Sequence, residues 1–580
     1  MSVASAELPG GFQQEDGPAW QRIRRYAVPA WMIERATAHR LAGDWRAACA
    51  AAAVDVGFEL PGLEARYGAA VAEAVAEDLR HFAPDLLRWH LPRLLAGRTT
   101  IAPELRILLA SYGGPGGPTL SVTTPLMTEG SQRLRLHCAP VVAGKRHRYA
   151  GHGFVPEDWT AIRPFWDARC ASELGERFAV ADGLAERIAG LWERADVVGA
   201  YGAAGIACDL TVPAPQRYQR PTDPKSLFAQ MPVDLTRLAP EVARLVAAGA
   251  GNRYRIAATW RCSVLLEHAG PDGLRARILE QAEAVGVPQL PRYAWQRLPD
   301  AELVRTGRIA PRELHPLVAA ALFPGAGPAV GPPGPDMGGP VRVRCRGGWH
   351  EVRSRGGVLD VPHTPEEQQR ERAMRAFGGA VSGCFAVQQI WTTGEGRLPR
   401  ALQAQRHEFF LRAQHGDTPG VVALLDAGMD PRVRDARGRG LLHVLHLLDH
   451  EALLPRLLAS GLDLEARDKA ERTPLLSAVH WGGSADLVRA LLAAGSRIDV
   501  IDETELSLSQ EIRRYKRSDL AFLRDRVDEE FPGIGADWFD EHLEYRAEAE
   551  AEAEDADDAD DEAAADDENK NDNKNEDEDA

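Results

Sequence analysis

A repeated phrase of about 33 residues near the carboxyl end constrains the fold more than any other feature of this sequence. A Leu-Leu-x-x-Gly motif closes three successive copies, with its glycines 33 and 34 residues apart, at Gly428, Gly461 and Gly495. One aspartate in each copy keeps the same steps, at Asp435, Asp468 and Asp502. A unit of this length cannot bury its apolar face alone, so the copies are expected to stack on one another.

Each copy carries the residues of a helix pair. Thr473 suits the N-cap and Pro474 the first helical position, because the N–H that proline lacks would have no partner there. Gly495 suits the end of the second helix, where a left-handed residue is needed. Atypical copies at residues 409–417 and 508–527 are expected to cap the array, which gives about four units over residues 404–535.

The repeated motif resembles the ankyrin repeat. Asp468 begins a finger loop, and Thr473-Pro474-Leu475 matches the opening of the family's Thr-Pro-Leu-His motif. The preceding copy keeps the family's Asp435, Gly438, Leu442 and His443. The resemblance covers residues 404–533 and implies a protein partner bound on a concave face, with His443 tying down backbone. The positions implied to touch the partner are Arg437, Arg439, Val444, Leu447, Lys469, Arg472, Ser477, His480 and Trp481.

Changes in composition predict how the rest of the chain is divided. Residues 324–340 hold six Pro and six Gly and predict a linker, and alternation around Gly347-Gly348 predicts a β-hairpin. Thr364-Pro365-Glu366-Glu367 predicts a capped helix start, and residues 272–284 are predicted to be helical. The expected parts are a disordered leader (1–18), a helical subdomain (19–111), a mixed α+β domain (112–323), the linker (324–340), a β-hairpin with helices packing on the array (341–403), the array (404–535), a closing segment (536–546) and a disordered acidic tail (547–580).

The predicted fold class is therefore an α+β N-terminal region followed by an all-α ankyrin-type helical repeat stack and a disordered acidic tail. The net charge is −17, but residues 547–580 carry −16 of it, so the rest of the chain is close to neutral. That tail is interpreted as a solubilising segment, with a lure for a basic partner as the alternative.

Composition also limits the function classes. Only six of the 68 basic residues are lysine, which indicates a coding bias rather than a nucleic-acid footprint. The turn at residues 41–45 predicts an αα-hairpin rather than a DNA-binding motif, because the second helix is almost all alanine. Seven scattered cysteines, the absence of a signal peptide and the absence of a long apolar run predict a cytoplasmic protein with no membrane partner.

No phosphate loop, dinucleotide loop, nucleophile elbow or metalloprotease motif occurs, so no cofactor, metal ion or catalytic residue is predicted. Cys345 and His350 flank the predicted hairpin turn and could act as nucleophile and base, although a coincidental pairing is the preferred interpretation. Two further clusters are expected to be structural, because neither has the spacing of a standard zinc site. They are His137, Cys138, His147 and His152, and His443, His446 and His450.

These patterns predict a non-enzymatic adaptor or scaffold that binds another protein through its ankyrin-type region. The alternative is an effector or enzyme whose activity lies in residues 19–320 and which the array targets. A deep pocket with converging polar groups would favour that alternative. A nucleic-acid partner is not expected, and the sequence does not predict the oligomeric state.

Overall fold

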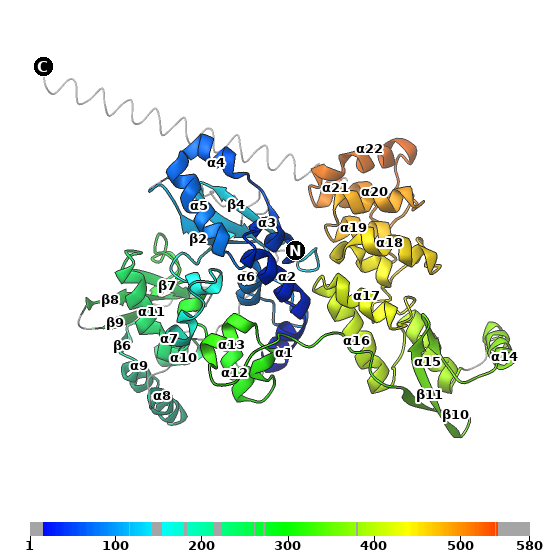
Figure 1. Cartoon of the computed structure of the whole chain (residues 1–580), viewed down its shortest axis with the longest axis horizontal. Coiled ribbons are helices and arrows are strands. Elements are labelled where there is room, and N and C mark those ends of the chain that lie inside the picture. Colours follow the sequence, from blue (N-terminus) through cyan, green and yellow to red (C-terminus); the bar gives the residue numbers. More distant parts are fainter. Residues whose placement is uncertain are drawn as a thin grey trace, which may run out of the picture. The chain divides into compact units, whose positions relative to one another are not determined.

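The computed structural model describes residues 16–114, 116–141, 154–178, 183–213, 223–231, 233–259, 261–270, 273–378, 381–539 and 541–542. These residues form two compact units, the first ending at Gly334 and the second beginning at Pro335 (Figure 1). The boundary lies in the Pro- and Gly-rich stretch of residues 324–340. The predictions for residues 1–15, for His147 and His152, and for the tail lie outside the described residues.

Unit 1 combines a group of helices with a five-stranded sheet in the order β1-β4-β3-β2-β5. Strands β1 and β5 pair in parallel with their neighbours, and the inner pairs are antiparallel. The strands are β1 (Val54–Val56), β2 (Leu105–Ser111), β3 (Thr119–Thr123), β4 (Leu134–Ala139) and β5 (Val155–Asp158). The helices are α1 (Gly17–Tyr26), α2 (Ala30–Leu41), α3 (Trp45–Ala51), α4 (Leu60–Tyr67), α5 (Ala69–His81) and α6 (Pro84–His90).

A second sheet of unit 1 has four strands in the order β6-β9-β8-β7. The helical prediction for residues 272–284 is wrong, because Leu274, Ala276 and Ile278 point with period two into the core and pair with β8. The strands are β6 (Ile206–Asp209), β7 (Arg253–Ala257), β8 (Cys262–His268) and β9 (Leu274–Glu280). Other elements are η2 (Arg163–Phe165), α7 (Glu173–Phe178), α8 (Leu184–Glu193), α9 (Val197–Ala203), α10 (Pro224–Gln230), α11 (Leu235–Ala247), η4 (Arg292–Ala294), α12 (Pro299–Arg305), η5 (Pro311–Glu313) and α13 (Pro316–Leu322).

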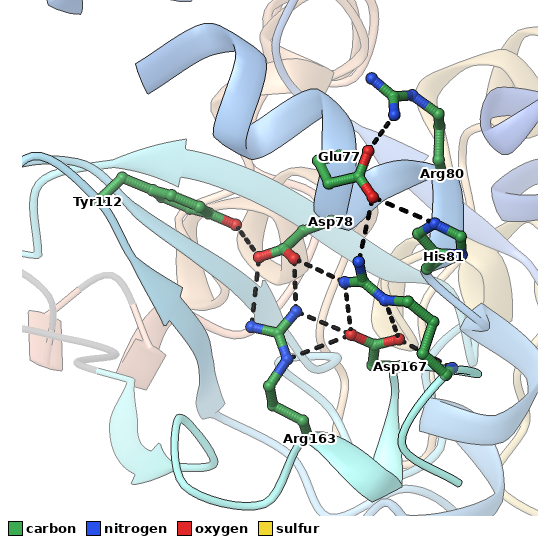
Figure 2. Close-up of polar contacts among 8 residues, drawn as sticks. Glu77, Asp78, Arg80, His81, Tyr112, Arg163 and Asp167 are labelled. Carbon is green, nitrogen blue, oxygen red and sulfur yellow. Dashed lines mark hydrogen bonds and ion pairs between the residues drawn. The ribbon is translucent and has the colours of Figure 1, made fainter. Parts of the chain in front are cut away.

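A network of charged side chains joins α5 to the segment that follows β5 (Figure 2). Asp78 accepts a hydrogen bond from the Tyr112 hydroxyl at 2.8 Å and forms ion pairs with Arg163 and Arg169. Buried Asp167 accepts from the same two guanidinium groups at 2.8 and 2.9 Å. The outer members of the network are Glu77, Arg80 and His81. Three carboxylates face three guanidinium groups, so the network neutralises its own charge and acts as a structural clamp.

Unit 2 begins with an antiparallel sheet in the order β10-β11-β12, formed by β10 (Val341–Cys345), β11 (Gly348–Arg355) and β12 (Val358–Asp360). Its helices are α14 (Pro365–Ala376), α15 (Gly383–Thr393), α16 (Arg400–Gln414), α17 (Thr418–Asp426), η6 (Leu441–Leu447), α18 (His450–Ala459), α19 (Pro474–His480), α20 (Ala485–Ala493), α21 (Leu508–Arg514), η7 (Ser518–Leu520) and α22 (Ala521–Glu530). Within the described ranges, no helix has the length and apolarity needed to cross a bilayer.

The three aspartates of the repeated motif make the same local structure in unit 2. In each loop the aspartate Oδ1 accepts hydrogen bonds from the backbone N–H groups two and four residues later, at 2.8–3.2 Å. Backbone hydrogen bonds then join neighbouring loops, from Lys469 N to Arg437 O and from Glu503 N to Ala470 O, both at 2.9 Å. Helix α19 packs against η6 and against α21, so each helix pair contacts the next one along the chain.

The predicted fold class is wrong. The described residues are mixed α/β, with 46% helix, 14% strand and three sheets spread along the sequence, rather than an α+β region followed by an all-α stack. The physical reason is that β10–β12 share one hydrophobic core with the helices of unit 2. Val343 and Val352 of the sheet belong to the same buried cluster as Leu402 and Leu475 of the helices. Strands and helices of unit 2 therefore bury their apolar faces together.

Candidate metal centre

Four side chains that can bind a metal ion converge in unit 2. Cys345 ends β10, His350 lies on β11, His363 follows β12, and Cys384 lies in the first turn of α15. One ligand atom from each of them lies within 4.8 Å of the other three. Cys345 Sγ is 3.6 Å from His363 Nε2, which is 3.2 Å from His350 Nδ1, and that atom is 3.5 Å from Cys384 Sγ.

Three of the six separations among these atoms match the edges of a zinc tetrahedron. Zinc binds sulfur at about 2.3 Å and nitrogen at about 2.05 Å, and tetrahedral angles then place a sulfur and a nitrogen about 3.6 Å apart. The same geometry places two nitrogens about 3.3 Å apart. The two observed sulfur–nitrogen distances, 3.6 and 3.5 Å, and the nitrogen–nitrogen distance of 3.2 Å match both values. Two thiolates would also neutralise a divalent cation within a buried site.

The hairpin turn places the first two ligands on one face. Its central residues are Arg346 and Gly347, with φ of +48° and +86°, one position earlier than the predicted Gly347-Gly348. Positive φ at both positions is the pattern of the two-residue turn that matches strand twist. In this register Cys345 lies opposite Gly348 and Val343 opposite His350, so Cys345 and His350 share the buried face of the hairpin.

A glycine allows α15 to approach β10 closely enough to add the fourth ligand. Gly383 has φ of +60°, and a Cβ built on it would lie 2.6 Å from Cys345 Sγ. Any larger residue would therefore be strained and would push Cys345 away from Cys384. The need for glycine before Cys384 therefore comes from the contact between α15 and β10, which the sequence alone does not show.

Glu367 orients the third ligand and caps a helix at the same time. Its carboxylate accepts a hydrogen bond from Thr364 N at 3.0 Å, while Glu367 N donates to Thr364 Oγ1 at 3.2 Å. The same carboxylate lies 3.3 Å from Nδ1 of His363, which leaves Nε2 facing the other ligands. A carboxylate behind a histidine fixes the ring and its tautomer in metal sites. The predicted capping sequence therefore also supports the metal centre.

The geometry does not favour a thiol nucleophile. Cys345 and Cys384 are both buried, and burial together with neighbouring Cys345 raises the pKa of the Cys384 thiol to about 12. A thiol that stays protonated is a poor nucleophile, whereas two thiols and two imidazoles are a characteristic donor set for zinc. The prediction of no metal ion did not anticipate this site. The spacing Cys-x4-His-x12-His-x20-Cys follows no standard pattern, so only the Cys345–His350 proximity was visible in the sequence.

The predicted partner-binding residues fall into three groups. Arg437 and Lys469 are exposed at neighbouring loop tips, and Leu447 and Trp481 are partly exposed. Arg439 pairs with Asp435 of its own loop at 2.8 Å, and Arg472 pairs with Asp502 of the next loop at 3.1 Å, so both also hold the loops in place. Three assignments need correction, because buried side chains cannot touch a partner: Val444, Ser477 and His480.

The histidines of the repeat make structural contacts. His443 Nδ1 accepts a hydrogen bond from Gly440 N at 3.2 Å, and Nε2 lies 3.2 Å from the carbonyl oxygen of Arg472 in the next copy. His480 contacts buried Glu511 at 2.9 Å. In unit 1, His137 lies 3.0 Å from Thr123 Oγ1 on the neighbouring strand. No known protein-family model matches the chain.

Proposed function

We propose that unit 2 is a zinc-binding module in which one metal ion, held by Cys345, His350, His363 and Cys384, fixes the hairpin against the helices. The observation that carries this proposal is the agreement of three ligand-atom separations with the edges of a zinc tetrahedron. The four ligands would leave no open coordination position, which is the pattern of a structural site rather than a catalytic one. The zinc would therefore stabilise the module and perform no reaction.

The test is the metal content of the full-length chain, measured by mass spectrometry after purification under reducing conditions. We expect one zinc per chain in the wild type and clearly less than one after Cys384→Ser and extensive dialysis, because the loss of a thiolate ligand weakens zinc binding. Cobalt substitution should give the visible absorption of a tetrahedral ion with thiolate ligands. This spectrum distinguishes a metal centre from a pair of cysteines that oxidises to a disulfide.

Cys208→Ser is the matched control, because Cys208 is half-buried on β6 in unit 1 and lies in no ligand cluster among the described residues. It should keep one zinc per chain. A wild-type protein that binds neither zinc nor cobalt while both cysteines are reduced would eliminate the proposal.

A second candidate function is ankyrin-type binding of a protein partner by the same unit. The observation that favours it is the row of linked loops built on Asp435, Asp468 and Asp502, which leaves Arg437 and Lys469 exposed side by side. Basic and aromatic residues on such a row are typical of protein-binding surfaces. The two functions are compatible, since the zinc site and the loops use different residues of unit 2.

Reversing the charge of the two exposed basic residues tests this second function. Arg437→Glu with Lys469→Glu should abolish co-purification of a specific protein with the tagged full-length chain, because both charges are reversed at the loop tips. Arg489→Glu with Arg526→Glu makes the same charge change on exposed positions of α20 and α22 and should leave recovery unchanged. Equal recovery with both double variants would remove the loop tips from the binding surface.

A further inference from the structure

A cavity of about 70 Å³ in unit 1 is lined by an unusual combination of aromatic and charged side chains. It lies among α1, the end of α6, β5, η2, α7 and η4. The aromatic part of its wall consists of Trp20, Trp159, Phe165, Phe178 and Tyr293. The charged part consists of Arg24, Arg93, Arg292, Arg297 and Glu157.

Three of the four arginines already have carboxylate partners. Arg24 makes a bidentate pair with buried Asp300, at 2.8 and 2.7 Å. Arg297 donates to Asp234 at 3.1 Å and to Glu302 at 3.2 Å. For Arg292 the partner is Glu157, which accepts its backbone N–H at 2.9 Å and lies 3.8 Å from its Nε. In each pair the carboxylate neutralises the charge of its arginine, so none of these three arginines requires a ligand.

Arg93 is the exception. Its side chain is 3% exposed, and Nη2 donates to the carbonyl oxygen of Arg88 at 2.8 Å. Nε and Nη1 have no acceptor among the described residues. Burial, with Arg88 and Arg24 nearby, lowers the pKa of Arg93 well below its ordinary value. An arginine that is buried beside other arginines, with two donors unused, is destabilising unless an anion joins it.

Two neutral groups around the same cavity also lack partners. Tyr293 is 4% exposed, and its hydroxyl makes no hydrogen bond within the described residues. His90 stacks on Phe165 with ring centroids 4.2 Å apart, and its Nε2 is likewise without a partner there. Burial and the charges of Arg24 and His315 lower the pKa of His90, which keeps its ring neutral. Within the described residues, the cavity therefore combines one arginine that has no carboxylate partner with two unused hydrogen-bonding groups.

We infer that this cavity binds a small oxyanion, the carboxylate or phosphate group of a ligand, with Arg93 providing the charge and Tyr293 a hydrogen bond. A volume of about 70 Å³ exceeds several-fold the space that a single water needs and admits a group of a few heavy atoms. The aromatic wall would contact whatever apolar part the oxyanion carries. This site lies in unit 1 and does not depend on the zinc proposal.

The experiment compares the thermal unfolding of the full-length chain in phosphate, in acetate and in sodium chloride of equal ionic strength. Wild-type Tm should rise by roughly 4 °C when one oxyanion is at a hundredfold excess over its Kd, because the ligand binds only the folded unit. The anion that produces the rise shows whether the cavity binds a phosphate group or a carboxylate group. Chloride at equal ionic strength should not reproduce it.

Arg93→Met provides the decisive comparison. It should unfold at the wild-type Tm or higher in chloride, because it removes an unpaired buried charge, and should lose the response to the oxyanion. Tyr293→Phe removes only an unpartnered hydroxyl, so it should fold normally and bind several-fold more weakly. Arg253→Met removes an exposed charge on β7 and should respond like the wild type.

Two results would overturn the inference. In the first, neither phosphate nor acetate raises the wild-type Tm above the chloride value. In the second, Arg93→Met and Tyr293→Phe both respond as strongly as the wild type, which would mean that the anions bind adventitiously elsewhere. If Arg93→Met does not fold, Tyr293→Phe alone decides, since an oxyanion affinity several-fold below that of the wild type supports the cavity and a wild-type affinity contradicts it.

Discussion

Two buried polar clusters in this chain differ in charge balance, and the difference indicates what each is for. In unit 1, Asp78 and Asp167 face Arg163 and Arg169, and each carboxylate has guanidinium partners (Figure 2). In unit 2, the candidate metal cluster contains two thiols and two imidazoles, which lie within hydrogen-bonding distance of one another. The first cluster consists of charges that neutralise one another, whereas the second consists of neutral groups that become metal ligands when the thiols lose their protons.

Burial of polar groups does not by itself mark a binding site. The unit 1 network is complete, so a ligand would have to break existing ion pairs. The donor atoms of the unit 2 cluster suit a cation, whereas the two donors of Arg93 that are unused within the described residues suit an anion. Complete networks stabilise the fold, and incomplete ones predict the charge of what binds there.

The largest effect should come from removing the metal ion. A strong zinc chelator should lower the free energy of unfolding of unit 2 by roughly 5 kcal/mol or more, since structural zinc contributes on the order of 10 kcal/mol to small domains. Hydrogen exchange measures this region by region. Peptides from β10 and β11 should lose protection, while peptides from β2 and β3 in unit 1 should not change. Equal loss in both units would mean that the chelator acts on something other than this cluster.

The next effect comes from breaking the unit 1 network. Asp167→Asn should cost about 2 kcal/mol of unfolding free energy, at the low end for a buried ion pair, because Arg163 and Arg169 are 32% and 38% exposed. Chemical denaturation of the full-length chain measures this loss. Glu77→Gln, at the exposed edge of the same network, is the control and should cost less than about 0.5 kcal/mol.

The same aspartate gives the network a defined pH dependence. Burial alone would raise the pKa of Asp167, but hydrogen bonds from Arg169 and Arg163 outweigh it and leave the pKa below its ordinary value. The resulting stability is complete above the ordinary aspartate pKa of about 3.9 and is lost as the pH falls through the lower, folded value. Asp167→Asn should therefore flatten the acid side of the stability curve of unit 1. An unchanged acid slope would show that other carboxylates control it.

The smallest effect tests the support of the metal ligand. Glu367→Gln should weaken zinc affinity about tenfold, because a neutral side chain orients His363 less strongly. Competition with a chromogenic chelator measures the affinity. Glu366→Gln changes the preceding residue, which is exposed and makes no hydrogen bond to His363 within the described residues, and should bind zinc like the wild type. Matching affinities for the two variants would assign Glu367 to helix capping alone.

Local patterns in the sequence predicted local structure well. Asp435, Asp468 and Asp502 form the same hydrogen-bonded loop, as expected of a repeated residue with one fixed environment. Thr473 caps α19 by accepting a hydrogen bond from Leu476 N at 3.3 Å, and Glu367 caps α14. These features depend on contacts within a few residues, so propensity and spacing are enough to predict them.

Long-range contacts decided the rest. Cys345 and Cys384 are 39 positions apart in the sequence, and they meet only because Gly383 lets α15 approach β10. The burial of Ser477 and the unpaired guanidinium of Arg93 likewise depend on which elements pack around them. The sequence by itself determined the repeated loops, the helix caps and the existence of the hairpin. Only the tertiary structure decided which polar groups end up with partners, because that depends on charges brought together from distant parts of the chain.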